Sequence, residues 1–159
     1  MSEATIEKLH VNGPEELLAL AGRELGPSRW VTIDQERIDT FARAVDDQEW
    51  IHVDVERAKA EGPFGNTIAH GLLLVALAPP LLHEHLEITG FRLSVNYGIN
   101  KVRFPATVVE GSRVRVHFTI PEVTEVKGGY DVPIDFKVEI EGNGEKPAAA
   151  GQIVLRHLT

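Results

Sequence analysis

The chain has 159 residues, with 16 basic and 24 acidic side chains, a formal net charge of −8 and no cysteine. The lack of cysteine excludes disulfides, thiolate catalysis and cysteine-based zinc sites, and the acidic balance disfavours general binding to nucleic acid. The length suits one domain over residues 1–159. The longest apolar run, Gly71 to Leu82, is too short to span a membrane. With no signal pattern at the N-terminus, we expect a soluble, cytoplasmic protein.

The first third of the chain predicts helices. Residues 14–25, PEELLALAGREL, begin with proline and two glutamates and carry leucines at helical spacing. Residues 29–33 are typical of a short strand. Thr32 or Asp34 is placed to cap a second helix, and Asp46 and Asp47 follow the end of that helix. Residues 53–60 predict a short surface helix.

The middle of the chain combines ionisable groups with an apolar helix. Asp47 and His52 are five residues apart, and a glycine-rich loop follows at residues 62–66. The segment from Gly71 to Ala78 has no polar residue, so we expect a helix that is buried all round. Pro79-Pro80 is expected to end or kink this helix, and the next residues, HEHLE, to carry the chain to the surface.

The last part of the chain predicts an antiparallel sheet. From Phe91 apolar and polar residues alternate, and three later segments are rich in Val, Ile, Thr and Phe, as strands are; these segments are residues 108–121, 123–140 and 148–157. Glycine pairs between them are typical of hairpin turns. Helices followed by strands indicate an α+β fold whose sheet wraps the apolar helix. The open edge of the sheet is suited to pairing with a second copy.

The run FARAVDDQEWIHVDVERAKAEGPFGNTIAHGLLL resembles the signature of the MaoC-like dehydratases, or (R)-specific enoyl-CoA hydratases. The positions in register with that motif are Phe41, Asp47, Ile51, His52, Ala58 and Ile68 to Gly71. GPFGNTIAHG and NYGINKVRFP are similar to the nodulation-protein-N-like branch of the family. There are departures: Asp46 stands where the family usually has Gly, and Glu49 and Trp50 replace Asn-Pro, of which the Asn supports the catalytic loop.

The resemblance implies a hot-dog fold: a curved antiparallel sheet wrapped around a central helix, with N-terminal helices, an overhang segment and usually a homodimer. It implies a hydro-lyase of fatty acid metabolism that reversibly adds water, in syn geometry, to trans-2-enoyl thioesters. The substrate is an enoyl-CoA or 3-hydroxyacyl-CoA thioester, and no cofactor is expected. Acyl chain length, the choice between CoA and acyl-carrier protein, and the pathway are left open.

The chemistry suits particular residues. Histidine titrates near neutrality, so His52 is interpreted as the base, while Asp47 orients the water and shares its proton. Which of the two returns the proton stays open. The N–H of Gly71 at a helix N-terminus suits a developing enolate oxygen. Substrate contacts are expected from Gln48, Trp50, Phe64, Gly65, Ile68, Ala69, His70, Asn96 and Tyr97.

Other interpretations of these residues were weighed. Outside the motif, Asp47 reads as a helix-end residue and His52 as an ordinary loop residue. His70 is interpreted as mainly structural at the helix start. His83 and His85 do not share a helix face, so we expect no metal site. Lys101 and Arg103 could meet the CoA phosphates or simply face solvent.

Two rival functions remain. The first is an acyl-CoA thioesterase of the same fold, which would place a catalytic carboxylate on or beside the central helix. Residues 71–82 contain no acid, which favours the hydratase. The second is a non-catalytic subunit of a heteromeric dehydratase. The intact Asp47 and His52 oppose it, whereas Glu49 and Trp50 keep it open.

Overall fold

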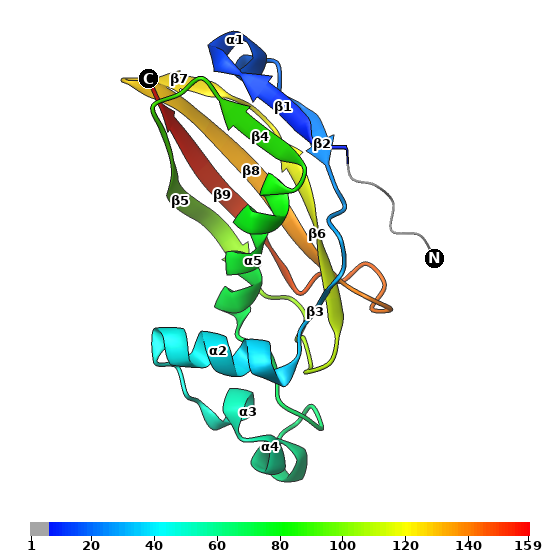
Figure 1. Ribbon diagram of the computed structural model, residues 1–159. Helices are drawn as coiled ribbons and strands as arrows, with labels where there is room; N and C mark the ends of the chain where they lie inside the picture. The colour runs from blue at the N-terminus through cyan, green and yellow to red at the C-terminus, as the bar shows by residue number, and fades with distance from the viewer. Residues whose placement is uncertain (1–6) are drawn as a thin grey trace.

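The structure is a computed structural model that describes residues 7–159 (Figure 1). The expected domain and the N-terminal segment without a signal pattern both include residues 1–6, which lie outside the described residues. The elements in chain order are β1 (Leu9–Asn12), α1 (Gly13–Leu18), β2 (Arg23–Leu25), β3 (Val31–Thr32), α2 (Gln35–Val45), α3 (Trp50–Val53), α4 (Val55–Glu61), α5 (Gly71–His83), β4 (Leu86–Thr89), β5 (Leu93–Arg103), β6 (Arg113–Ile120), β7 (Thr124–Val126), β8 (Gly129–Ile140) and β9 (Ala149–Leu158).

Seven strands form one sheet in the order β2-β6-β8-β9-β5, with β3 beside β6 and β7 beside β8. All of its pairings are antiparallel. Buried and exposed residues alternate along β6, as the period of a strand requires. On the outer face Arg115 pairs with Glu139 at 2.7 Å and Arg156 with Asp131 at 2.6 Å. The α+β arrangement expected from the sequence is confirmed.

Helix α5 crosses one face of the sheet, with α2, α3 and α4 gathered beyond its N-terminal end and β1 and β4 beyond its C-terminal end (Figure 1). Its leucines at 73, 74, 81 and 82 are buried among the inward residues of β6, β8 and β9. The expected burial on all sides is wrong for a single chain, because Leu72 is 64% exposed and Ala76 and Pro80 are also exposed. Among residues 7–159, nothing covers this side of α5.

The helix expected over residues 14–25 is shorter than predicted. Helix α1 ends at Leu18, and residues 23–25 form β2, which pairs with β6. Gly22 has a φ of 82°, a left-handed conformation that interrupts a helix and that glycine adopts without steric cost. The Gly22 N–H donates to the Ile120 carbonyl at 2.7 Å. Pairing with a sheet edge thus overrides the helical spacing of the leucines.

The end of the central helix also differs from the prediction. Helix α5 contains Pro79 and Pro80 and continues to His83. The buried Leu81 and Leu82 pack in the core on the far side of the prolines, and this packing holds the last turn although two amide donors are missing. His85 and Leu86 are buried rather than at the surface, since β4 forms a parallel pair with β1. The sequence reasoning missed both of these strands.

Strand β5 is an edge of the sheet, because within residues 7–159 it pairs with β9 alone. The register shifts between Asn96 and Gly98, so the residue between them, Tyr97, has no direct partner, as in a bulge. Tyr97 is 58% exposed and Ile99 59% exposed. The edge thus exposes large apolar side chains among polar ones. No helix within residues 7–159 has the length and apolar character needed to cross a membrane.

Candidate active site

The turn after α2 places Asp47. Asp34 caps the start of α2 by accepting from the Arg37 N–H at 2.9 Å, so of the two expected caps Asp34 is used. At the other end Asp46 adopts a φ of 59°, a left-handed conformation that asparagine and aspartate tolerate better than most residues. The Asp47 N–H donates to the Ala42 carbonyl at 3.1 Å. Asp46 thereby makes the turn for which the family usually employs glycine.

His52 lies on the one-turn helix α3, and its ring is held by a backbone carbonyl. The Nδ1 atom lies 2.7 Å from the Ile68 carbonyl oxygen. Because a carbonyl oxygen only accepts, Nδ1 carries the proton in this contact. The neutral ring therefore keeps an unprotonated Nε2, which is the form that a general base needs.

His70 lies between the two proposed catalytic residues. Its ring stacks on that of His52, with centroids 3.8 Å apart and planes 23° apart. Its Nε2 atom lies 3.1 Å from the Asp47 carbonyl oxygen and 3.9 Å from Oδ2 of the Asp47 carboxylate. The ring is 3% exposed, and its Nδ1 atom is buried without a partner. His70 thus connects the Asp47 turn to the His52 ring.

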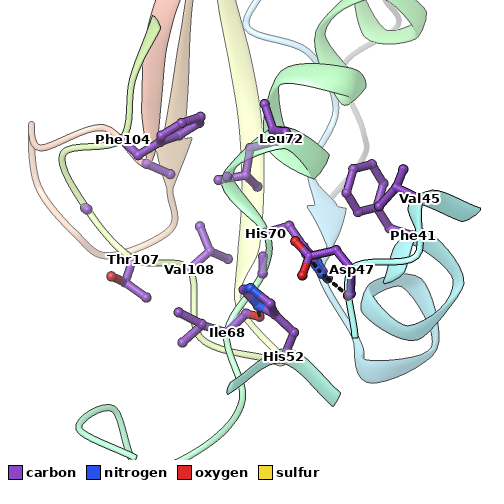
Figure 2. A pocket seen from close by; sticks show the side chains of 15 residues that line it. Phe41, Val45, Asp47, His52, Ile68, His70, Leu72, Phe104, Thr107 and Val108 are labelled. Carbon is purple, nitrogen blue, oxygen red and sulfur yellow. Dashed lines mark hydrogen bonds and ion pairs between the residues drawn. The ribbon is translucent and has the colours of Figure 1, made fainter. Parts of the chain in front are cut away.

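The three side chains meet in one pocket of about 350 Å³, seen in Figure 2 with Phe104 and Thr107 across from the two histidines. One carboxylate oxygen of Asp47 and one ring nitrogen of each histidine lie within 4.8 Å of one another. The residues lining the pocket are Phe41, Val45, Asp47, His52, Ile68, Ala69, His70, Gly71, Leu72, Leu74, Phe104, Ala106, Thr107, Val108 and Ala148. A polar cluster therefore faces a largely apolar wall.

Gly71 is the first residue of α5, and His70 at the cap position makes no side-chain capping bond. The Gly71 N–H is one of the amides at a helix start that have no partner within the helix. A Cβ added to Gly71 would lie 2.7 Å from Cε1 of Phe104. Glycine at a helix start also lets a substrate approach the backbone closely. In the structure the Phe104 ring occupies that space, so glycine is also required by the packing of Phe104.

The structure separates the predicted substrate contacts into two groups. Ile68, Ala69 and His70 line the pocket with Asp47 and His52. The remaining six do not line it; they are Gln48, Trp50, Phe64, Gly65, Asn96 and Tyr97.

Three of these six have other neighbours. Trp50 lies under Arg57, whose guanidinium carbon is 4.3 Å from the ring centroid. Asn96 lines a second pocket beside Leu82, near the C-terminal end of α5. The guanidinium carbon of Arg156 lies 3.3 Å from the centroid of the Tyr97 ring. In a single chain, these residues are therefore placed away from the Asp47–His52 pair.

Sequence reasoning missed the far wall of the pocket. Phe104 and Ala106 follow β5, and Ala148 precedes β9. No local pattern marks an alanine as a lining residue, and these residues join the site only when distant strands assemble. The resemblance of NYGINKVRFP to the family was the one signal close to Phe104.

The same cluster has the composition of a metal site, although none was expected. Two of its nitrogens are already used, because His52 Nδ1 contacts the Ile68 carbonyl and His70 Nε2 contacts the Asp47 carbonyl. His70 Nδ1 is enclosed. The atoms left for the pocket are His52 Nε2 and the Asp47 carboxylate, fewer than the three protein ligands of a typical catalytic zinc.

The sequence of the chain is similar to those of known proteins. A family profile described as MaoC like domain matches residues 17–139. The chain is 46% identical over 144 residues to 3-hydroxyacyl-thioester dehydratase Z of Mycobacterium tuberculosis, covering 90% of this chain and 94% of the relative. It is 41% identical over 129 residues to nodulation protein N of Rhizobium leguminosarum bv. viciae, covering 80% of each.

Among solved structures, the unliganded R-hydratase PhaJ1 from Pseudomonas aeruginosa superposes with a TM-score of 0.70 and 22% identity. The superposition covers 87% of this chain and 81% of the other. This likeness confirms the predicted hot-dog fold, with its antiparallel sheet around α5.

Proposed function

The chain belongs to the MaoC-like dehydratase family, and from that premise we propose that it reversibly adds water, in syn geometry, to trans-2-enoyl thioesters, forming (R)-3-hydroxyacyl thioesters. One observation carries the proposal: Asp47 and His52 share a pocket with Gly71, whose N–H begins α5 and has no partner within the helix. A carboxylate and a neutral imidazole suit the activation of water. A helix N-terminus suits the charge that develops on a thioester oxygen.

In the proposed reaction, Nε2 of His52 removes a proton from a water molecule that the Asp47 carboxylate orients. The water oxygen forms a bond to C3 of the enoyl thioester, and the electron pair of the double bond moves to the carbonyl oxygen. The Gly71 N–H donates to that enolate oxygen. Return of one proton from the Asp47–His52 pair to C2 completes the addition. Because a single pair serves both carbons, the two additions occur on the same face.

The apolar wall gives the acyl chain a surface to pack against. Leu72, Leu74 and Phe104 line the pocket together with the polar cluster. A low-dielectric surrounding strengthens the hydrogen bond at the enolate oxygen. The reaction as proposed uses no cofactor, since each proton transfer and each charge is assigned to a residue of this chain.

The test is a direct assay with crotonyl-CoA. Hydration removes the conjugated double bond, so the ultraviolet absorbance of the enoyl thioester should fall without release of free thiol. Chiral analysis of the product should give the (R)-alcohol. Release of free thiol instead would identify a thioesterase and reject the proposal. Purified protein that shows no turnover alone, but gains it with a partner chain, would identify a non-catalytic subunit.

The proposal includes a cytoplasmic homodimer in which each chain is one MaoC-like domain. The support is the open edge at β5, where Tyr97 and Ile99 are exposed, together with the exposed Leu72. If two β5 strands paired in antiparallel fashion, the first half of one strand would lie beside the last half of the other. The first half holds Asn96, and the last half leads into Phe104. The expected contact between Asn96 and substrate would then come from the second chain. A monomeric mass by light scattering would reject this assembly.

A further inference from the structure

Helix α3, which carries His52, has little means of holding itself in place. It spans only residues 50–53, and Glu49 at its cap position makes no side-chain hydrogen bond to it. A single helical turn is unstable in isolation, because nucleation costs more than one turn returns. Glu49 also stands where the family resemblance expects a supporting Asn. Another part of the chain must therefore fix the His52 backbone.

That support comes from Gln35, the first residue of α2. Its side-chain Nε2 donates to the His52 carbonyl oxygen at 2.8 Å and to Oδ1 of Asp39 at 2.8 Å. Both neighbours are acceptors, so both amide hydrogens are used and the orientation of the amide is determined. The Gln35 Oε1 atom then faces the Thr67 hydroxyl, which donates to it at 2.5 Å.

Thr67 belongs to the segment that also holds the His52 ring. It is fully buried, and its carbonyl accepts from the Glu110 N–H at 2.9 Å. The next residue, Ile68, accepts from His52 Nδ1 and donates its N–H to the Ile51 carbonyl at 3.1 Å. Two consecutive residues thus control His52 at two points: Thr67 acts on its carbonyl through Gln35, and Ile68 acts on its ring.

We propose that Gln35 and Thr67 are positioning residues for the catalytic histidine, and that they supply the side-chain support which Glu49 does not give; Glu49 holds His52 only through its backbone carbonyl, which accepts from the His52 N–H at 2.9 Å. The inference rests on the proposed function. With the carbonyl and the ring both held against the 67–68 segment, rotation of α3 is blocked. His52 Nε2 then keeps its place relative to Asp47 and Gly71. Small displacements of a reacting group, on the order of 1 Å, cost about a hundredfold in rate.

The experiment uses near-isosteric variants of the full chain with crotonyl-CoA. Thr67→Val removes the hydroxyl at nearly constant volume, and Gln35→Met removes the amide. Each is expected to lower kcat about tenfold or more while KM changes within about twofold, because the substrate surface is untouched. Thr67→Ser keeps the hydroxyl and should retain most of the wild-type kcat. Thr40→Val makes the same chemical change at an exposed hydroxyl on α2 that lies outside this network and is the matched control, with unchanged kcat.

A second readout does not depend on activity. The ring nitrogen NMR signals of His52, assigned with His52→Gln, should shift in Thr67→Val and stay in place in Thr40→Val. Unchanged kcat and unchanged ring signals in Thr67→Val overturn the positioning role. An equal loss of kcat in Thr67→Ser and Thr67→Val also overturns it, by assigning the effect to volume. If the wild-type protein shows no turnover, the proposed function is rejected. If the His52 ring signals nevertheless shift in Thr67→Val, the positioning role is retained.

Discussion

The two ends of α5 each hold a pair of histidines, and the pairs differ in whether their rings contact backbone carbonyls. At the N-terminal end, the rings of His52 and His70 contact backbone carbonyls and line an open pocket. At the C-terminal end, His85 and His157 are 7% and 2% exposed, and the Nε2 atom of each is buried without a partner. Burial lowers the pKa of both His85 and His157.

The comparison shows what makes a histidine useful for catalysis. A carbonyl partner fixes the tautomer at His52 and leaves a lone pair toward the pocket. Deep burial without a partner leaves His85 neutral and out of reach of a substrate. Residue type alone does not distinguish the histidines at the two ends of α5. Substitutions at each end test this difference, from the largest expected effect to the smallest.

The largest effect should come from the catalytic pair. Asp47→Ala and His52→Ala are each expected to lower kcat for hydration of crotonyl-CoA at least about a hundredfold, because general acid–base catalysis is lost. His83→Ala, an exposed histidine at the opposite end of α5, is the matched control and should keep wild-type turnover. Circular dichroism should show an intact fold in all three. Wild-type turnover in either member of the pair would reject the assignment.

A smaller loss is expected at the start of α5. Gly71→Ala would bring a methyl group within 2.7 Å of the Phe104 ring, so the ring or the helix start must shift beside the proposed oxyanion amide. We expect kcat to fall about tenfold or more, as when one oxyanion donor is weakened. Gly128→Ala is the control for kcat, because the turn between β7 and β8 does not line the pocket and an added Cβ there meets nothing within 4 Å. Full activity of Gly71→Ala would remove Gly71 from the mechanism.

The other end of the helix should respond to pH through stability. His85 and His157 have folded-state pKa values below the ordinary 6.5. The unfolded chain therefore binds protons more strongly, and stability is full above about pH 6.5 and is lost as the pH falls below it. Each histidine contributes up to about 1.4 kcal/mol per pH unit in that window. Urea unfolding at about pH 7.5 and about pH 5.5 measures the difference.

A substitution isolates that contribution. His85→Leu should reduce the loss of unfolding free energy between the two pH values, because one proton-binding group of the unfolded state is removed. The same change at the exposed His83 is the control. If acid lowers the free energy of unfolding equally in wild type and His85→Leu, the burial of His85 does not contribute to acid sensitivity.

The smallest expected effect is none. If Asp47 and His52 act without a metal, prolonged EDTA treatment followed by removal of the chelator should leave the hydration rate within about twofold of the untreated protein. Loss of activity that zinc restores would assign the Asp47, His52 and His70 cluster to a metal centre and change the mechanism.

The sequence located the parts of the site that lie close together in the chain. Asp47, His52 and Gly71 could be named because they belong to one motif of adjacent segments. The stacking of His70 on His52 was not predicted, since it depends on how α3 and the start of α5 meet. Phe104 and Ala148 enter the pocket from distant strands, and no local periodicity encodes such contacts. The N-terminal helix was overestimated because leucine spacing does not report the competing pairing of β2 with β6.

The left-handed conformation of Asp46 has a consequence for engineering. Most L-residues in this region cost about 1–2 kcal/mol relative to ordinary helical geometry, aspartate less, whereas glycine adopts it freely. Asp46→Gly would relieve that steric penalty. Asp46 directly precedes Asp47 but does not line the pocket, so no lining side chain is altered. The turn is thus a place where thermal robustness can be adjusted independently of chemistry.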